Sequence, residues 1–398
     1  MIYSDFQGKK LSLLGFGTMR LPLRPGGTET DIDEAQVEEM VAHAMANGVN
    51  YFDTAYPYHG GFSELVIGRV LKKYPRDSFY LATKFPGHQV ASTYEPAVVF
   101  EDQLKKCQVD YFDFYLLHNI CENSMATYND PKWGIIDYFM EEKRKGRIRH
   151  LGFSSHAEVD TLREFLEKYG KEMEFCQIQL NYMDWTLQKA KEKCELLAKW
   201  NIPVWVMEPL RGGKLAKLSD ADEAKLYTLR PDDSIASWGL RWARGVEGVK
   251  MILSGMSNLH QMQDNVKTFT VDAPLSSQET ELLYEIAEGM KRSVPCTACR
   301  YCCEGCPMEL DIPMLLATYN DLRFAPITNT GMRIEALPPE KRPDACLACG
   351  KCAQVCPQKI NIPEELKAMA ALLETVPKWS DLCRNREEAA RRLRERNN

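Results

Sequence analysis

The sequence predicts an α/β fold: a (β/α)8 TIM barrel followed by a small, mainly helical domain. Three observations lead to this prediction. Eight short apolar or β-branched runs alternate with amphipathic stretches. The last of these runs ends at residue 255, and ten of the fourteen cysteines lie beyond residue 295. We therefore expect a barrel at 1–290, a cysteine-rich domain at 291–376 and a charged tail at 377–398.

The apolar runs are the expected barrel strands. They occupy residues 11–17, 49–53, 79–84, 112–118, 148–154, 176–180, 203–207 and 249–255. Alternation of strands with helices indicates a parallel sheet, and eight such units in about 250 residues fit a closed barrel. An open dinucleotide-binding sheet fits less well, because "GFGTMR" (15–20) lacks the third glycine of G-x-G-x-x-G.

Amphipathic stretches between the runs are the expected helices. In the stretch 31–48, Asp31 or Asp33 can cap the start, apolar residues recur at helical spacing, and Gly48 can end the helix. The stretch 157–170 has the same pattern and also ends at a glycine. The tail mixes arginines with glutamates, so we expect a solvated helix rather than a docking arm.

Composition limits the classes of partner. The net charge of -6 argues against nucleic acid or an anionic membrane. The first residues lack a signal-peptide pattern, and there is no run of about 18 apolar residues. Cysteines without a secretion signal are expected to be metal ligands rather than disulfides. We therefore expect a cytoplasmic protein that binds neither nucleic acid nor a membrane.

Ionisable side chains stand at successive strand ends of the expected barrel. They are Asp53, Tyr58, Lys84 and His118. Each has an ordinary structural explanation by itself, but chemistry in such barrels lies at these carboxyl ends. The set suits carbonyl reduction. Lys84 would lower the pKa of the Tyr58 phenol, and Asp53 would keep the lysine charged. His118 would orient the substrate oxygen while Tyr58 donates a proton.

Residues 11–270 resemble the aldo-keto reductase superfamily. "NYFDTAYPY" (50–58) is similar to its Asp and Tyr motif, "LATK" (81–84) to its Lys motif and "DYFDFYLLH" (110–118) to its His motif. The resemblance implies an oxidoreductase that interconverts a small-molecule carbonyl and an alcohol with a nicotinamide cofactor. It also implies that the four residues above are catalytic, with Tyr58 as the proton donor.

The same resemblance implies an extended NAD(P)H site across the barrel mouth. The implied contacts are Gly17, Thr18, Asp53, Ser154, Ser155, Gln177, Met207, Pro209, Leu210, Gly212, Gly255, Ser257, Gln261, Asp264 and Asn265. Ser154, Ser155 and Gln177 would lie near the carboxamide. The loop 208–213 would cover the pyrophosphate, and the segment 254–265 would hold the adenosine end.

Three positions depart from the family pattern. Met207 stands where many members stack an aromatic ring on the nicotinamide, and Ser155 replaces a common Asn. The segment 254–265 contains no Lys or Arg to bind a 2′-phosphate. NADH is therefore at least as plausible as NADPH, and the missing ring leaves room for a flavin.

Two cysteine quartets share the spacing C-x2-C-x2-C-x3-C-P. They are Cys296, Cys299, Cys302 and Cys306, then Cys346, Cys349, Cys352 and Cys356. This spacing predicts two 4Fe–4S clusters, because zinc, the alternative, usually takes two separated pairs. Cys303 is left out, since choosing it instead of Cys302 would make the two quartets differ. The small domain is therefore expected to be an iron–sulfur domain.

Helical patterns at 311–323 and 361–376 make this domain resemble the helical ferredoxin type. In two-cluster ferredoxins the last cysteine of each quartet serves the other cluster. The resemblance therefore implies that Cys356 joins the first three cysteines and that Cys306 joins the second three.

Together these patterns indicate an oxidoreductase in which the clusters exchange electrons with the barrel site. A redox partner protein could dock at the cluster domain. Nicotinamide transfers two electrons as hydride whereas a cluster carries one, so a flavin could bridge the two. Two alternatives stay open: an electron-transfer or redox-sensing binding module, and an ordinary reductase whose clusters are structural.

Overall fold

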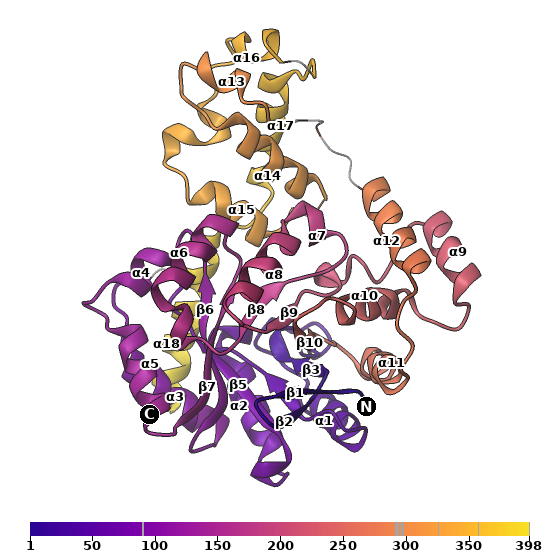
Figure 1. Ribbon diagram of the computed structural model, residues 1–398. Helices are drawn as coiled ribbons and strands as arrows, with labels where there is room; N and C mark the ends of the chain where they lie inside the picture. The colour runs from indigo at the N-terminus through magenta and orange to yellow at the C-terminus, as the bar shows by residue number, and fades with distance from the viewer. Residues whose placement is uncertain are drawn as a thin grey trace. The chain divides into compact units, whose positions relative to one another are not determined.

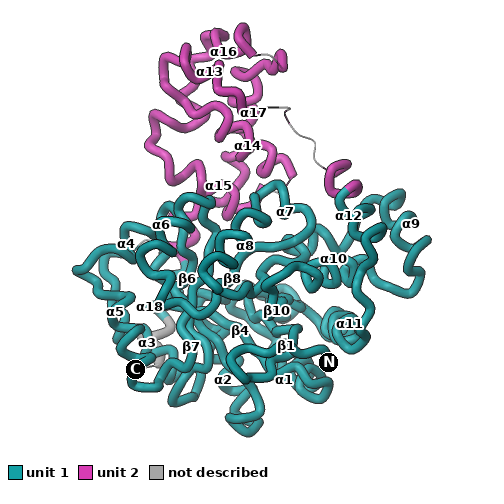
Figure 2. The backbone as a smooth tube through the Cα atoms, viewed as in Figure 1, with its two compact units in different colours: residues 1–284, 386–398 teal, residues 285–385 magenta. Residues whose placement is uncertain are grey.

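The computed structural model describes residues 1–89, 91–290, 294, 296, 298–324, 326–356 and 358–397. They form two compact units, which Figure 2 colours separately: residues 1–284 with 386–398, and residues 285–385. The predicted boundary after residue 290 falls beside 291–293, outside the described residues. The predicted tail is one helix, α18 (Trp379–Asn397), which contributes residues to both units.

Eight parallel strands form a closed barrel in the first unit (Figure 1). They are β3 (Leu14–Gly17), β4 (Tyr51–Asp53), β5 (Tyr80–Phe85), β6 (Phe112–Ile120), β7 (Ile148–Ser155), β8 (Cys176–Gln179), β9 (Val204–Met207) and β10 (Val249–Ser254). The last strand pairs with the first, with Ile252 opposite Leu14. The predicted barrel is confirmed, and all eight carboxyl ends open at one mouth.

A hairpin that the sequence did not predict covers the opposite end of the barrel. It consists of β1 (Tyr3–Phe6) and β2 (Lys9–Ser12), so the single strand predicted at 11–17 is wrong. Phe6 packs edge-on against Trp205 at 5.0 Å and lies 5.7 Å from Phe114, between ring centres. Both rings come from the first half of their strands. Aromatic burial therefore closes the amino end and leaves the mouth as the open end.

Helices surround the barrel between successive strands (Figure 1). They are α1 (Glu34–Ala46), α2 (Phe62–Leu71), α3 (Pro96–Cys107), α4 (Met125–Asn129), α5 (Ile135–Arg144), α6 (Val159–Tyr169), α7 (Asp184–Leu187), α8 (Ala190–Lys199), α9 (Asp220–Leu229), α10 (Ile235–Arg244), α11 (Leu259–Thr270) and α12 (Ser277–Met290). Of the two predicted caps of α1, Asp33 is the one used: its carboxylate accepts the Gln36 N–H at 3.2 Å. The predicted helix at 157–170 corresponds to α6.

The second unit is built from two similar halves. Its helices are α13 (Tyr301–Glu304), α14 (Ile312–Phe324), α15 (Thr328–Glu335), α16 (Lys351–Gln354) and α17 (Ile362–Glu374). Cys302 in α13 and Cys352 in α16 are both buried in its core, as are Ile312 and Ile362 at the starts of the long helices. Each pair is separated by fifty residues, so the two quartets lie in equivalent local structures.

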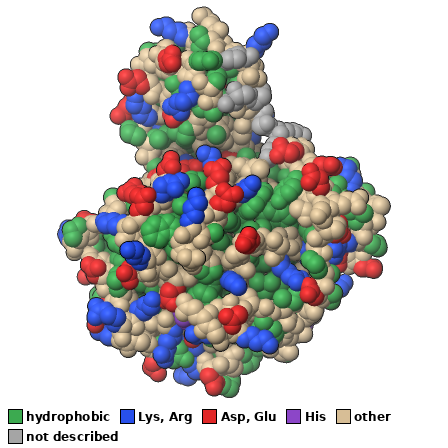
Figure 3. All heavy atoms as spheres, viewed as in Figure 1, with side chains coloured by type: hydrophobic (Ala, Val, Ile, Leu, Met, Phe, Trp, Pro, Cys, Tyr) green, Lys and Arg blue, Asp and Glu red, His purple; other side chains and the backbone are tan. Residues whose placement is uncertain are grey.

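Charge is mixed on the surface. On the face drawn in Figure 3, Lys and Arg side chains are interspersed with Asp and Glu side chains. Among the described helices, none has the length and apolar character needed to cross a membrane.

Candidate active site

The four predicted side chains meet at the barrel mouth. Asp53 is the last residue of β4, Lys84 and His118 lie near the ends of β5 and β6, and Tyr58 follows β4 in a short helical turn at Tyr58–Gly61. Lys84 Nζ donates to Asp53 Oδ1 at 2.5 Å and to Tyr58 Oη at 3.3 Å. The Tyr58 ring stands edge-on to His118, with ring centres 5.8 Å apart. Parallel strands bring these groups to one edge because their carboxyl ends lie side by side.

The turn after Tyr58 holds the phenol in place. His59, Gly60 and Gly61 all have positive φ, at 54°, 62° and 93°, a conformation that glycine adopts without strain. The His59 ring fixes this turn: Nδ1 lies 2.6 Å from the Glu29 carbonyl oxygen, and Nε2 accepts the Leu21 N–H at 3.1 Å. Sequence reasoning missed His59, although the "HGG" that follows Tyr58 is a recognisable turn signal.

Burial and pairing set the charges of this group. Burial alone would lower the pKa of Lys84, but the Asp53 carboxylate and the Tyr58 oxygen outweigh it, and the pKa lies above its usual value. Lys84 is therefore an ammonium at neutral pH. Burial raises the pKa of Asp53, and Lys84 opposes that rise. The ion pair leaves Asp53 Oδ2 buried, with no hydrogen-bond partner among the described residues.

Lys84 lowers the pKa of Tyr58, as the sequence predicts, but the pKa of the buried phenol still lies above its usual value. Burial raises this pKa, and the attraction of Lys84 only partly offsets the rise. Desolvation of the phenolate outweighs one ammonium at 3.3 Å. Tyr58 is therefore a protonated phenol throughout the neutral range, which is the state that a proton donor needs.

A second histidine, which the sequence did not single out, lies beside His118. The His88 and His118 ring centres are 4.2 Å apart. Burial lowers the pKa of His88 to about 3, and burial with the neighbouring His88 lowers the pKa of His118 well below its usual value. Both rings are neutral at physiological pH. A neutral His118 can donate one hydrogen bond to a substrate oxygen without adding charge.

The residues predicted near the carboxamide lie where β7 and β8 end. Gln177 is buried, and its Oε1 has no hydrogen-bond partner within the described part of the chain. Ser154 Oγ accepts the Asn119 N–H at 2.9 Å, whereas the Ser155 hydroxyl donates to the Ile120 carbonyl oxygen at 2.9 Å. The unsatisfied acceptors Gln177 Oε1 and Asp53 Oδ2 therefore fit an amide N–H and a ribose hydroxyl, as a nicotinamide nucleoside presents them.

The loops predicted to hold the rest of the cofactor also lie at the mouth. Gly17 ends β3 next to Ser254 and Gly255: a Cβ at Gly17 would lie 3.4 Å from the Ser254 carbonyl oxygen. Thr18 is buried and donates to the Asp53 carbonyl oxygen at 2.9 Å. After β9, Met207 and Leu210 are half-buried, Pro209 is buried and Gly212 is exposed.

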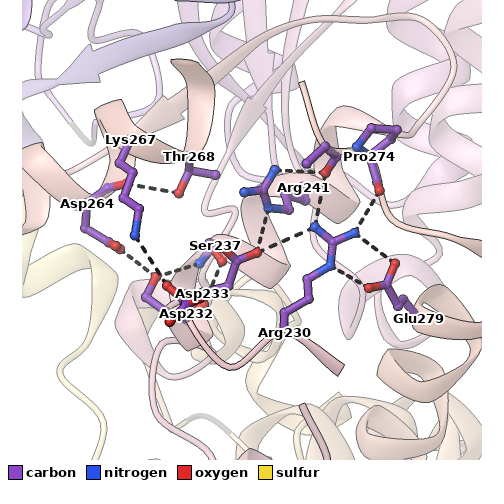
Figure 4. A network of polar contacts seen from close by, with 12 residues as sticks. Arg230, Asp232, Asp233, Ser237, Arg241, Asp264, Lys267, Thr268, Pro274 and Glu279 are labelled. Atoms are coloured by element: carbon purple, nitrogen blue, oxygen red, sulfur yellow. Dashed lines mark hydrogen bonds and ion pairs between the residues drawn. The ribbon is translucent and has the colours of Figure 1, made fainter. Parts of the chain in front are cut away.

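Hydrogen bonds order the segment 254–265 from within. Ser257 N–H donates to Gln261 Oε1 at 2.8 Å, and Asn265 Nδ2 donates to Ser254 Oγ at 2.7 Å. Asp264 is less available than the sequence suggests, because it accepts from Ser234 Oγ at 2.6 Å. Figure 4 shows Asp264 beside a larger network in which Arg230 and Arg241 pair with Asp233. Arg241 also donates to the Ala273 carbonyl oxygen at 2.8 Å, which joins α10 to the segment that follows α11.

One cation at these loops comes from outside the predicted segment. Arg20 lies 3.5 Å from Glu208 and would contact a Cβ at Gly212 (3.1 Å) or at Gly255 (3.5 Å). The prediction that 254–265 supplies no positive charge is correct, but the loop after β3 brings one beside it. Sequence reasoning missed Arg20 because only barrel closure brings the ends of β3, β9 and β10 together.

The cysteines of the second unit line two separate pockets. One is lined by Cys306, Cys346, Cys349 and Cys352, and the other by Cys296, Cys299, Cys302 and Cys356. The last cysteine of each quartet thus lies with the first three of the other. Cys303 lines neither pocket, and Pro357 lies outside the described residues. Apolar side chains complete the walls, Leu310 and Leu366 in the first pocket and Leu316 in the second. Four cysteines around one pocket are the ligand set of a 4Fe–4S cluster.

The closed barrel and the group of ionisable side chains at its mouth are those of an oxidoreductase. Comparison with known proteins agrees: the description "Aldo/keto reductase family" matches residues 13–288, and "4Fe-4S dicluster domain" matches residues 295–360. The chain belongs to the aldo/keto reductase family and carries a 4Fe–4S dicluster domain after the barrel.

Individual relatives are distant. The NADH-specific methylglyoxal reductase of Escherichia coli is 25% identical over 325 residues, which cover 71% of this chain and 96% of that protein. The probable aldo-keto reductase 1 of Glycine max is 28% identical over 52% of this chain and 58% of its own. Among solved structures, an aldo-keto reductase from Bacillus halodurans in its holo form superposes with a TM-score of 0.57, at 25% identity, over 72% of this chain and 96% of its own.

Proposed function

We propose that this protein reduces a small carbonyl compound to an alcohol, with Tyr58 as the proton donor, or runs the reverse reaction, in which the Tyr58 oxygen accepts the proton. The observation that carries this proposal is the position of Lys84 Nζ between Asp53 Oδ1 and Tyr58 Oη in a buried site. The protonated phenol has a hydrogen to give, and the ammonium stabilises the phenolate that remains. Neutral His118 hydrogen-bonds the carbonyl oxygen and orients it toward Tyr58.

A bound nicotinamide would supply the hydride in this reaction. Asp53 Oδ2 and Gln177 Oε1 are the acceptors that would hold its ribose and its carboxamide. The NADH-specific relative and the lack of Lys and Arg in 254–265 favour NADH. Arg20, beside Gly212 and Gly255, is placed to neutralise the pyrophosphate rather than to select a 2′-phosphate.

We propose further that two 4Fe–4S clusters, one in each cysteine pocket, exchange electrons with this site. Two clusters at one electron each match the two electrons of a hydride in number; a flavin bound at the barrel mouth would accept the hydride, pass its electrons on singly and release the proton. Three exposed apolar side chains, Tyr301, Leu347 and Val355, flank the ligands and suit a docked redox partner. We also propose a reducing compartment such as the cytoplasm, where cysteines stay reduced and can bind clusters; the cysteines that the structure describes form no disulfide.

A structural role for the clusters is the second candidate. Cys302 and Cys352 belong to the hydrophobic core of the second unit, so the clusters could stabilise that core without carrying electrons. An anaerobic titration with NADH and NADPH separates the two candidates. If the clusters carry electrons, visible absorbance bleaches and a paramagnetic signal appears; if they are structural, neither changes.

Two controls complete this experiment. Mass spectrometry of the purified protein identifies a bound nicotinamide, or the flavin for which Met207 leaves room. A Tyr58→Phe variant should lose carbonyl turnover but keep cluster reduction by NADH, because the phenol takes part only in proton transfer. If Tyr58→Phe lost both carbonyl turnover and cluster reduction, the phenol would not be limited to proton transfer.

A further inference from the structure

The end of the chain packs against the barrel beside the proposed active site. Residues 386–398, the second part of α18, group with the barrel, where the sequence predicted a solvated helix. A Cβ at Gly60 would lie 3.3 Å from the Ala389 Cβ, so this helix touches the turn that follows Tyr58. In Figure 1 it is the yellow helix that passes behind the barrel strands.

Arg386 lies on the same face of the helix as Ala389. Residues three apart in a helix are neighbours on one side, so Arg386 also faces the barrel, and its side chain is half-buried. Its charge acts on Tyr58, His59, His88 and His118, lowering the pKa of each. Together with the approach of Ala389 to Gly60, this places Arg386 near the loops that follow β4, β5 and β6.

Within the described part of the chain, this guanidinium has no carboxylate within 4.0 Å. Arg384 donates to Asp381 at 2.7 Å, and Arg392 donates to Glu388 at 3.0 Å. Among the tail arginines whose side chains the structure describes, Arg386 alone has no carboxylate within 4.0 Å. The neighbouring groups do not pair with it: both histidines are neutral, and Asp53 is paired with Lys84. Glu29, whose charge also acts on His59, makes no ion pair with Arg386 within 4.0 Å.

We propose that Arg386 is a specificity-determining residue that binds a carboxylate on the substrate. This inference rests on the proposed carbonyl chemistry and names its substrate class: an aldehyde or ketone that also carries a carboxylate. A half-buried charge without a partner is costly, and an arginine fork pairs well with a carboxylate. The phosphates of a nicotinamide cofactor are expected at 208–213 and 254–265, beyond β9 and β10, so they do not account for Arg386.

A matched pair of substrates tests the proposal: 4-carboxybenzaldehyde, which is anionic, and methyl 4-formylbenzoate, its neutral ester. The full-length protein should have a kcat/KM for the acid about tenfold to a hundredfold above that for the ester. Arg386→Gln should abolish this preference by raising KM for the acid at least tenfold more than KM for the ester. Arg386→Lys should restore part of it. The control Arg392→Gln removes a paired arginine of the same helix and should change neither substrate.

Two results would overturn the proposal: no preference for the acid in the wild type, or an equal loss for both substrates in Arg386→Gln. Calorimetric binding of the two compounds gives a readout that does not need turnover. Tighter binding of the acid that depends on Arg386, without reduction of either compound, would support the carboxylate site and contradict the proposed reaction. Turnover of both compounds that does not change in Arg386→Gln would support the proposed reaction and contradict the carboxylate site.

Discussion

Lys84 Nζ lies 2.5 Å from Asp53 Oδ1, in a site where both side chains are almost completely buried. A buried ion pair gains less from mutual attraction than it loses by leaving water, unless further polar contacts support it. Here the Thr54 carbonyl oxygen, at 2.7 Å, and Tyr58 Oη accept the remaining lysine protons. The pair is thus arranged around the phenol, and the first prediction concerns that phenol.

Removing the Tyr58 hydroxyl should stop reduction. Tyr58→Phe keeps the ring against His118 but removes the proton donor, so kcat should fall by about a hundredfold to ten-thousandfold. Cofactor oxidation at saturating carbonyl substrate measures the effect. The matched control is Tyr80→Phe, at the amino end of β5 and far from the mouth along the same strand, which should retain normal kcat. A Tyr58→Phe enzyme within threefold of the wild type would rule out this donor.

The pH profile of reduction should be flat across the neutral range. The pKa of Tyr58 is raised above its usual value of about 10, so the proton donor is not lost as pH rises to about 9. The pKa of His118 is lowered below its usual value of about 6.5, so the ring stays neutral as pH falls to about 6. Measurement of kcat from pH 6 to pH 9 tests both directions. A loss of rate with a midpoint near pH 8 would mean that bound substrate or cofactor lets Lys84 lower the Tyr58 pKa.

Pairs of cysteine substitutions should reveal the crossed ligand sets. Because Cys356 lines the pocket of the first three cysteines, Cys296→Ser with Cys356→Ser should damage one cluster and leave the other intact. Cys296→Ser with Cys306→Ser should damage both. Iron content and paramagnetic resonance of the reduced proteins distinguish the two variants. The opposite pattern would indicate that each quartet binds its own cluster. Cys303→Ser should retain the full iron content.

The loop 208–213 depends on a buried ion pair behind it. Arg211 Nε lies 3.2 Å from Asp184 Oδ2, and both side chains are buried. Asp184→Asn would leave a buried guanidinium without its counter-ion, at a cost of about 3–5 kcal/mol in the free energy of unfolding. It should also raise KM for the cofactor, because Gly212 and its neighbours lose their support.

Chemical unfolding of the holoprotein and cofactor kinetics measure these two effects. Asp220→Asn is the matched control, since the Asp220 carboxylate is fully exposed and 3.7 Å from Lys217. An exposed pair of this kind contributes little to the free energy of unfolding, because water screens it. If Asp184→Asn and Asp220→Asn destabilised the protein equally, the buried pair would not be what holds the loop.

Much of the candidate site was predictable because its signals are local. Asp53, Lys84 and His118 each follow an apolar run, and the carboxyl ends of parallel strands must meet at one edge. The cysteine spacing is also a local signal, because C-x2-C-x2-C-x3-C by itself indicates the ligands of a 4Fe–4S cluster. His88 and Arg20 were missed because a loop residue has no periodic pattern. Their closeness to His118 and to Gly255 depends on barrel closure. The hairpin was missed because residues 11–17 form one nearly continuous apolar run, which predicts a single strand. In the structure this run contains the end of β2 and the whole of β3, with the chain turning between Ser12 and Leu14.

The sequence by itself determined the barrel, its four ionisable side chains and the two cysteine quartets. The hydrophobic period of a strand or helix, the spacing of cysteines and the chemistry of a side chain are all properties of short segments. Only the tertiary structure decided the protonation of Tyr58, since burial outweighs the charge of Lys84. It also decided the position of Arg386. The arginines and glutamates around it in the sequence predict a solvent-exposed helix, whereas the structure packs this helix against the barrel. Contact between Ala389 and Gly60 joins residues more than three hundred positions apart, and no local pattern encodes such a contact.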